Sequence, residues 1–412
     1  MLTVEEYNQQ ESAAVAALPN RVVEMVNPVV FAAEGYPARV RRDSELWKYL
    51  DVMHETRFER DFATLHGGAI TGRQFALLQR VARVAHELSR ESFGLNLTTR
   101  GSLLRALNAY QHIADIFGGS PANVFELGPG SGYLGCLFIL NGWGYAASDI
   151  AQAFYLFQNR LWNRASGGRV RELAANPDWD GKISPGEPVH LPWWEFYKLF
   201  ERGVPSFDVV TCNHALAEMN PNSMAFALRV AREMLRGNGL KAFVFEGWGF
   251  ERFVPRSTIT KEFHRCGFNL VHNDDQITVF APRDSDCASP AARLPRFGSF
   301  QGVRSGPPGA APSRARRPGK FTRSVTAFKE LLGSLDFLSG LKRVSASFAF
   351  WPPQVSLPMN PASERILSGR QRRATESSVG LAEVNAFYAK LLNSTDFRTA
   401  DERFLDLIGR SY

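Results

Sequence analysis

Apolar side chains recur at helical spacing through the first part of the chain. Between Thr71 and Ser92 one face would carry a continuous apolar stripe, which predicts an amphipathic helix with Thr71 as its N-cap. A second helix is predicted over Ser102–Phe117, because apolar residues recur every three or four positions before Gly118 and Gly119 end the pattern. We therefore expect residues 1–100 to form a helical N-terminal region.

Short apolar runs alternate with helical segments over residues 101–282. An order of strand, helix, strand, helix predicts a parallel sheet with helices on both faces. The last two runs are joined by five polar residues and predict an antiparallel hairpin. The expected strands are Val124–Leu127, Tyr145–Ser148, Phe207–Cys212, Leu240–Phe245, Phe268–Val271 and Ile277–Phe280, and the expected helices are Tyr133–Leu140, Ala151–Arg164 and one that begins at Pro221 after the N-cap Asn220. The predicted fold is an α/β, Rossmann-like and mostly parallel sheet with a terminal antiparallel hairpin.

The rest of the chain has a different composition. Residues 283–320 are rich in Pro, Gly, Ser and Arg, which predicts a basic linker. Residues 321–412 form a C-terminal extension with helical patterns at Val325–Leu338 and Leu381–Leu392. The predicted organisation is thus a helical N-terminal region (1–100), an α/β domain (101–282), a linker (283–320) and a partly helical extension (321–412).

Charge and composition exclude several classes of protein. With 44% hydrophobic and 22% charged residues, the 412-residue chain has an ordinary globular composition, and no apolar run is long enough to cross a bilayer. The net charge is +7, but the stretch Arg283–Arg323 alone holds nine basic and two acidic residues. The basic excess is therefore a property of the linker, and we expect no nucleic-acid partner.

The four cysteines lie far apart and form no C-x-x-C pair. This spacing argues against a structural zinc site and against a disulfide framework. The N-terminus also lacks a basic stretch followed by an apolar one, as a signal peptide would require. Together these features predict a cytoplasmic protein.

The most informative motif is the glycine loop after the first predicted strand. Gly128, Gly130 and Gly132 allow a sharp turn and the close approach of a ligand to the backbone, ahead of a helix N-terminus. Gly130–Gly135 matches the dinucleotide pattern G-x-G-x-x-G, whereas Glu126–Gly132 matches E-x-G-x-G-x-G, the first motif of class I S-adenosylmethionine-dependent methyltransferases. Glu126 favours the second interpretation, because a carboxylate suits a cationic ligand and repels a pyrophosphate.

Asp149 ends the second predicted strand, 21 residues after Gly128. An acidic side chain at this position can accept hydrogen bonds from both hydroxyls of a ribose, a geometry that nicotinamide enzymes share. The alternative is that Asp149 caps the helix beginning near Ala151.

The chain resembles the bacterial sugar O-methyltransferase family within class I. The resemblance covers roughly residues 100–282 and lies in the runs Glu126–Gly135, Ser148–Tyr155, Gln158-Asn159 and Cys212–Met219. It implies that S-adenosylmethionine is the cofactor and that a small-molecule or glycan hydroxyl is the acceptor. By the same resemblance, the cofactor-binding residues are Glu126, Gly128, Gly130, Gly132, Asp149 and Asn213. Residues 1–100 would form a lid over the substrate.

Two tryptophans fall where the third strand of that fold is expected. Trp193 and Trp194 lie in the run Val189–Phe196, which lacks the usual acidic contact to adenine. Either they stack on the adenine or they pack in the core.

A sugar hydroxyl needs a base or a metal ion to remove its proton. His214 is the leading candidate base, because imidazole titrates near neutral pH and the residue follows a strand at the carboxyl edge of the sheet. Glu218 is the second catalytic candidate and would orient His214. Alternatively, Glu218 and Glu246 hold a divalent cation, although no tight cluster of ligands indicates a metal.

Other functions remain open at this stage. There are three alternatives: a methyltransferase that acts on another kind of small molecule, a nicotinamide-dependent oxidoreductase, or a scaffold without enzymatic activity. Amino-methylating enzymes of nucleic acids are disfavoured, since Cys212–Ala215 stands where an N/D-P-P-Y/F motif would be required. The sequence carries no signal for the oligomeric state.

Overall fold

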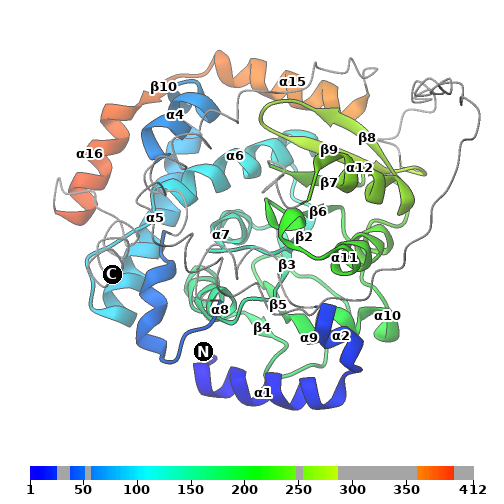
Figure 1. The fold of residues 1–412 in the computed structure, drawn as a ribbon. Coiled ribbons are helices and arrows are strands. Elements are labelled where there is room, and N and C mark those ends of the chain that lie inside the picture. The colour runs from blue at the N-terminus through cyan, green and yellow to red at the C-terminus, as the bar shows by residue number, and fades with distance from the viewer. Residues whose placement is uncertain (26–37, 52–56, 247–253, 286–359, 394–412) are drawn as a thin grey trace, which may run out of the picture. The chain divides into compact units, whose positions relative to one another are not determined.

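An eight-stranded mixed sheet forms the centre of the computed structural model, which describes residues 1–25, 38–51, 57–246, 254–285 and 360–393 (Figure 1). Its spatial order is β4-β5-β3-β2-β6-β7-β9-β8. The strands are β2 Asn123–Leu127, β3 Gly144–Asp149, β4 Arg171–Glu172, β5 Val189–Pro192, β6 Val209–Thr211, β7 Ala242–Phe245, β8 Phe268–Asn273 and β9 Thr278–Pro282. All neighbours from β4 to β7 are parallel, whereas β9 pairs antiparallel with both β7 and β8. The predicted fold class is confirmed.

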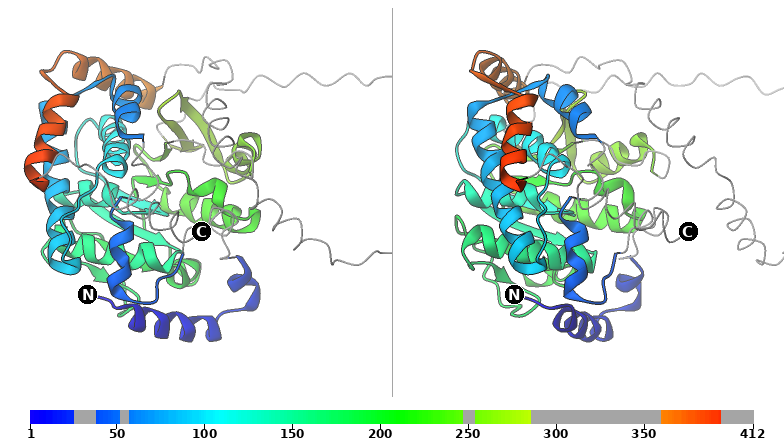
Figure 2. Two further views of the ribbon diagram at one scale, coloured as in Figure 1. Left: turned by 60° about the vertical axis from the view of Figure 1, so that its left-hand side comes forward. Right: turned by 90° about the vertical axis from the view of Figure 1, so that its left-hand side faces the viewer.

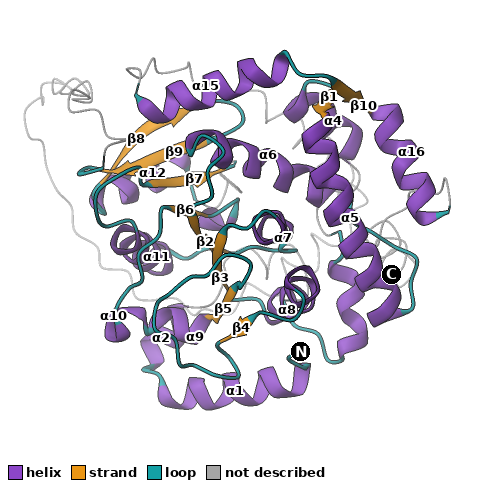
Figure 3. Cartoon of the chain, turned by 180° about the vertical axis from the view of Figure 1, so that it is seen from behind, coloured by secondary structure: helices purple, strands orange, loops and turns teal. Residues whose placement is uncertain are grey.

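Helices cover both faces of this sheet (Figures 1 and 3). Both faces need cover because successive residues of each strand point to opposite sides of the sheet and are apolar on both. Val124 and Val209 belong to one apolar cluster, and Phe125 and Val210 belong to the other. The first cluster is completed by α5 Gly72–Phe93, α6 Gly101–Ile116, α7 Tyr133–Leu140 and α8 Gln152–Ser166. The second is completed by α9 Trp193–Tyr197, α10 Leu199–Arg202, α11 Pro221–Met234 and α12 Arg256–Arg265.

The N-terminal region is largely helical in its described part. It contains α1 Val4–Ala17, α2 Asn20–Met25, the 3-10 helix η1 Asp43–Tyr49 and α4 Phe58–His66, followed by the short strand β1 Ala69–Thr71. The predicted N-cap Thr71 is confirmed, because its side chain accepts a hydrogen bond from the backbone N–H of Gln74, whose side chain caps Thr71 in return. None of the helices in the described ranges is long and apolar enough to cross a membrane.

Helix α6 begins where a buried carboxylate meets its first turn. The Asp51 carboxylate accepts hydrogen bonds from the backbone N–H groups of Arg100, Gly101 and Ser102, at 2.9, 3.2 and 2.9 Å. These groups have no partner within the helix, so Asp51 caps it from outside, since Arg100 supplies no side-chain cap. This contact fixes the helix that carries Arg105 and Asn108 towards the carboxyl edge of the sheet.

The C-terminal extension packs on the same compact unit as the sheet. Its described elements are α15 Pro361–Ala374, β10 Ser378–Gly380 and α16 Leu381–Leu392, and the predicted helix over Leu381–Leu392 is confirmed. Strand β10 pairs antiparallel with β1, and α16 packs on α5, as two turned views make visible (Figure 2). The predicted helix Val325–Leu338 and most of the predicted linker lie outside the described residues.

Candidate active site

The glycine loop joins the end of β2 to the start of α7 in the middle of the sheet. Its three glycines have left-handed backbone angles, with φ of 66° at Gly128, 57° at Gly130 and 77° at Gly132. A Cβ at Gly128 would lie 2.8 Å from that of Ala215, and one at Gly132 would lie 3.0 Å from Gln158 and Trp162. Two of the glycines are therefore required by close packing as well as by backbone conformation.

Gly130 differs from its neighbours in what surrounds it. No described atom lies within 4 Å of the position that a Cβ would take there. The loop around it is nevertheless held firmly, since Gln158 Nε2 donates to the Gly130 carbonyl at 2.7 Å and Trp162 Nε1 donates to the Gly132 carbonyl at 2.8 Å. The arrangement is a fixed backbone turn with one open side, as a ligand that approaches the main chain requires.

Glu126 lies directly beneath this loop and is 2% exposed. Its Oε2 accepts a hydrogen bond from the Tyr145 hydroxyl at 2.7 Å, and its carboxyl is also hydrogen-bonded to Asn213. Burial raises the pKa of Glu126 to about 7, against the hydrogen bond from Tyr145, which lowers it. A cation placed beside this carboxyl would favour its charged form.

Asp149 ends β3 on the other side of the loop and is also buried. Its Oδ1 accepts from the Ala151 N–H at 2.9 Å, and its Oδ2 accepts from Gln158 Nε2 at 2.8 Å. Burial raises the pKa of this carboxyl, and its hydrogen bonds, including one from the backbone of Gly130, oppose that shift. The alternative, that Asp149 caps the following helix, is wrong, because the N-cap of α8 is Ala151 and no side chain caps that helix. At the start of that helix Asp149 bonds only the N–H of Ala151, and its place beside the loop is compatible with the predicted ribose contact.

Asn213 ties the ends of three neighbouring strands together. Besides its contact with Glu126 in β2, its Oδ1 accepts from the Glu246 backbone N–H at 2.8 Å, and its Nδ2 lies 3.3 Å from Thr211 Oγ1 in β6. The structure therefore brings Asn213 together with Glu126 and Glu246, and Gly130 together with Asp149 through Gln158.

His214 follows Asn213 and precedes the 3-10 helix η3, Ala215–Glu218. Its φ of 65° is unusual for a residue with a side chain, and such backbone strain is concentrated at functional sites. Burial lowers the pKa of His214 to about 3, helped by the nearby charges of Arg105 and Arg57. The imidazole is thus neutral throughout the physiological range and has little affinity for a proton.

A second group of charges lies beside His214. Arg105 on α6 donates from Nε to Asp61 at 2.8 Å and from Nη1 to Glu246 at 2.9 Å. Burial raises the pKa of Glu246 to about 7, against the charge of Arg105, and Asp61 adds to the rise. Sequence reasoning missed Arg105 and Asp61, because the helices that carry them meet the sheet only in the folded chain.

The metal alternative gains no support from this geometry. Glu246 is paired with Arg105, whose charge a nearby divalent cation would oppose. Glu218 is buried at the end of η3, and its charge adds to the burial that raises the pKa of the Cys212 thiol. Over the described ranges, no group of three or more His, Cys, Asp or Glu side chains is placed to hold a metal ion.

Trp193 and Trp194 are core residues, each 3% exposed. The indole N–H of Trp193 donates to Glu11 at 2.8 Å, and Trp194 packs edge-on against Tyr7 at 5.2 Å between ring centroids. Of the two alternatives for this pair, packing against α1 is therefore the one observed. His190 in β5 has two polar partners that the sequence did not indicate, since Glu172 and Gln158 both contact its ring.

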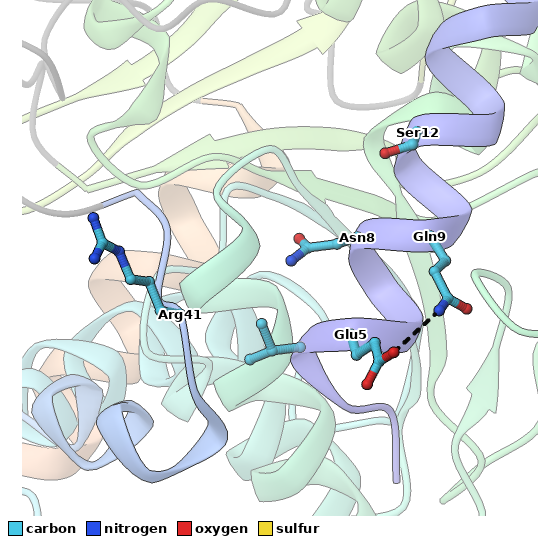
Figure 4. Close-up of a pocket in the computed structure, with 6 residues that line it drawn as sticks. Glu5, Asn8, Gln9, Ser12 and Arg41 are labelled. Atoms are coloured by element: carbon cyan, nitrogen blue, oxygen red, sulfur yellow. Dashed lines mark hydrogen bonds between the residues drawn. The ribbon is translucent and has the colours of Figure 1, made fainter.

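A surface pocket of about 560 Å³ lies along α1 (Figure 4). It is lined by Val4, Glu5, Asn8, Gln9, Ser12 and Arg41, none of which was predicted as a site residue. Asn8 connects it to α8, since its Oδ1 accepts from Gln152 Nε2 at the start of that helix at 2.7 Å.

Comparison with known proteins shows similarity of fold to solved structures. No protein-family model and no curated protein matches the chain. Among solved structures, a TehB-like SAM-dependent methyltransferase from Corynebacterium glutamicum is 13% identical, with a TM-score of 0.31, over 42% of this chain and 88% of its own. A magnesium protoporphyrin IX methyltransferase from Synechocystis is 12% identical, with a TM-score of 0.29, over 44% and 83%. A ribosomal protein L11 methylase from Lactobacillus delbrueckii is 13% identical, with a TM-score of 0.28, over 42% and 76%.

Proposed function

We propose that the chain is an S-adenosylmethionine-dependent methyltransferase. The observation that carries the proposal is the open side of Gly130, in a loop flanked by two buried carboxyls, Glu126 in β2 and Asp149 at the end of β3. A positively charged methionine end suits the first carboxyl and ribose hydroxyls suit the second. The residues present therefore fit this cofactor.

The order of the strands supports a methyltransferase over the nicotinamide alternative. A dinucleotide-binding fold has a mostly parallel sheet of order 3-2-1-4-5-6, whose last strand follows the fifth without an inserted antiparallel neighbour. Here β9 is inserted antiparallel between β7 and β8, as the hairpin at the end of the methyltransferase sheet requires. The acidic Glu126 beneath the loop would also repel a pyrophosphate.

When bound, the cofactor supplies a methyl carbon already activated by its sulfonium. The protein then has to align the acceptor and remove its proton. His214 remains the base that the sequence predicts, but its low pKa makes it a weak one. We add Glu246 as a second candidate base, because its pKa of about 7 suits proton removal at neutral pH and Arg105 holds its carboxyl in place.

The proposed acceptor is a sugar or glycan hydroxyl. Besides the resemblance of the sequence, the polar groups at the ends of β6 and β7 support it, since Asn213, His214 and Glu246 are all able to bond hydroxyls.

The described cysteines, Cys136, Cys212 and Cys266, are all free thiols, in keeping with a cytoplasmic enzyme.

The test is transfer of a labelled methyl group from S-adenosylmethionine to a panel of glycosides and nucleotide sugars. We expect at least one acceptor to gain one methyl group by mass spectrometry, without inhibition by a chelator. Reduced nicotinamide should show no change in fluorescence on mixing with the protein. Binding of reduced nicotinamide, with no transfer to any acceptor, would favour the oxidoreductase instead.

A further inference from the structure

A buried polar cluster contacts the glycine loop through the Gly130 carbonyl. At its centre is His190, in the middle of β5 and 0% exposed. The imidazole stacks on the Tyr155 ring, with 3.6 Å between centroids and an angle of 11° between planes, and Trp162 packs edge-on at 4.7 Å. Both ring nitrogens also have polar partners, so the packing does not explain the residue fully.

The first partner is Gln158, whose orientation is fixed by its other contacts. Its Nε2 donates both to the Gly130 carbonyl at 2.7 Å and to Asp149 Oδ2 at 2.8 Å. Both of these atoms are acceptors, so the amide nitrogen must face them and Oε1 must face His190. Because His190 Nε2 lies 3.1 Å from that Oε1, it carries a hydrogen.

The second partner is Glu172, at the end of β4. His190 Nδ1 lies 3.1 Å from its Oε2, which also accepts from Asn159 Nδ2 at 2.7 Å. Its Oε1 accepts from the Ala174 N–H at 2.9 Å and from the Tyr155 hydroxyl. An ionised Glu172 carboxylate can only accept hydrogen bonds, so each of its four neighbours has to be a donor. Asn159, Ala174 and Tyr155 are three of these donors, and a protonated His190 Nδ1 is the fourth.

We propose that His190 is a buried imidazolium, paired with Glu172, and that it is a positioning residue for the cofactor loop. It holds Gln158 in the one orientation that ties the Gly130 carbonyl to the Asp149 carboxylate. The positioning of a ligand rests on the proposed function, whereas the charge of His190 does not.

The charges around the ring agree with this assignment. Glu172 faces it from β4 and Asp149 from the end of β3, and both are acidic. Tyr155 faces it from α8, and the Tyr155 hydroxyl is itself near Tyr7 of α1 and Glu195 of α9. A parallel aromatic ring stabilises a cation. The positive charge also favours the ionised form of Asp149, which is the form that accepts hydrogen bonds from two hydroxyls.

The direct test is nitrogen-15 spectroscopy of histidine-labelled protein. At neutral pH both ring nitrogens of His190 should resonate as protonated, and in Glu172→Gln the ring should become neutral. A neutral His190 ring in the wild type, with one bare nitrogen, would overturn the proposal. A ring that stays charged in Glu172→Gln would overturn the pairing.

The positioning role is tested with His190→Phe, which keeps a ring on Tyr155 and removes both hydrogen bonds. We expect the affinity for S-adenosylhomocysteine to fall about tenfold, and the side-chain amide of Gln158 to exchange with solvent faster. His264→Phe is the control, since His264 bonds the carbonyl of Phe268 on the far hairpin. An unchanged Gln158 amide in folded His190→Phe refutes the role, even if the wild type binds no adenosyl ligand and the proposed function fails. If His190→Phe does not fold, His190→Leu is measured in the same two ways, since it also removes both hydrogen bonds and keeps an apolar side chain against Tyr155 and Trp162.

Discussion

The carboxyl groups at the carboxyl edge of the sheet are buried without full compensation. Glu126 is bonded to Tyr145 and Asn213, and Glu246 is paired with Arg105, yet burial raises the pKa of each to about 7. A folded protein gains nothing from burying such groups in the absence of a partner. Perturbed carboxyls of this kind are typical of sites that bind a charged ligand or transfer a proton.

Stability should therefore fall as the pH rises. The pKa of Glu126 is about 7 when folded, against an ordinary value of 4.5, so the folded state binds the proton more tightly. The contribution of Glu126 to the free energy of unfolding is full below about pH 4.5 and is lost as the pH passes about 7. Glu126→Gln cannot ionise, so its stability should fall less than that of the wild type between about pH 5 and about pH 8. Urea denaturation over this range measures it, and parallel curves would contradict the assignment.

The two candidate bases predict different pH profiles of turnover, once an acceptor is found. With Glu246 as base, turnover should increase with pH around an apparent pKa near 7. Glu246→Gln should reduce turnover about 10²–10⁴-fold. With His214 as base, the profile should be flat near neutrality, because its pKa is about 3. We expect the increase with pH. A flat profile combined with an active Glu246→Gln enzyme would exclude Glu246, and Glu262→Gln, in a surface ion pair with Arg265, is the control.

Local sequence predicted the loop but not the side chains behind it. Glu126 and Asp149 were found because each lies at the end of an apolar strand, at a fixed place relative to the glycines. His190, Gln158 and Glu172 come from three separate elements, and their contact depends on how α8 packs across β4 and β5. No periodicity in the sequence carries that information, and a buried charge pair is not visible in a pattern of apolar residues.

At the scale of elements, the C-terminal extension is joined to the sheet by specific polar contacts. Arg373 pairs with the buried Asp115 of α6 at 2.5 Å, and Arg370 pairs with Asp274 of the hairpin turn at 2.6 Å. The Val271 carbonyl lies at an irregularity of the β8–β9 ladder and accepts from Asn360 at 2.6 Å. Removing α15 would take Arg373 from Asp115 and Arg370 from Asp274, and would uncover the surface of α6 on which α15 packs.

We therefore expect residues 357–412, expressed as a separate tagged fragment, to capture residues 1–290 in a pull-down. Burial of α15 and α16 against α6 and α5, with the β1–β10 pairing, supplies the affinity. A fragment that carries Arg370→Ala and Arg373→Ala should capture markedly less. Two fragments that purify separately would mean that the extension is dispensable for the fold.

The strands and helices of the sheet could be predicted because their patterns are local and strong. The order of apolar runs predicted β2, β3, β6, β7, β8 and β9, whereas β5 was expected only from the family resemblance. Strand β4 was missed, because its two residues are too few to form a pattern. The β1–β10 pair escaped prediction for another reason, since its three-residue strands lie about 300 residues apart in the chain and pair only through tertiary packing.

At the scale of the whole molecule, the candidate site is a set of fixed contacts across the carboxyl ends of the central strands. Asn213 joins β2, β6 and β7, while Gln158 joins β2 to β3. Arg105 fastens α4 and α6 to the end of β7. Such a network pre-organises the edge of the sheet, and we expect a ligand to meet the backbone at the open side of Gly130.

The most direct test of this account is calorimetric titration of S-adenosylhomocysteine into the wild type, Gly130→Ala and Gly142→Ala. Gly130 and Gly142 both have left-handed φ, 57° and 71°, and neither has an atom within 4 Å of an added Cβ, so both variants carry similar backbone strain. Only at Gly130 would the methyl group occupy the ligand's place. The account predicts saturable binding by the wild type and Gly142→Ala, and an affinity at least about tenfold weaker for Gly130→Ala. No binding by the wild type, or equal affinity in Gly130→Ala, would contradict it.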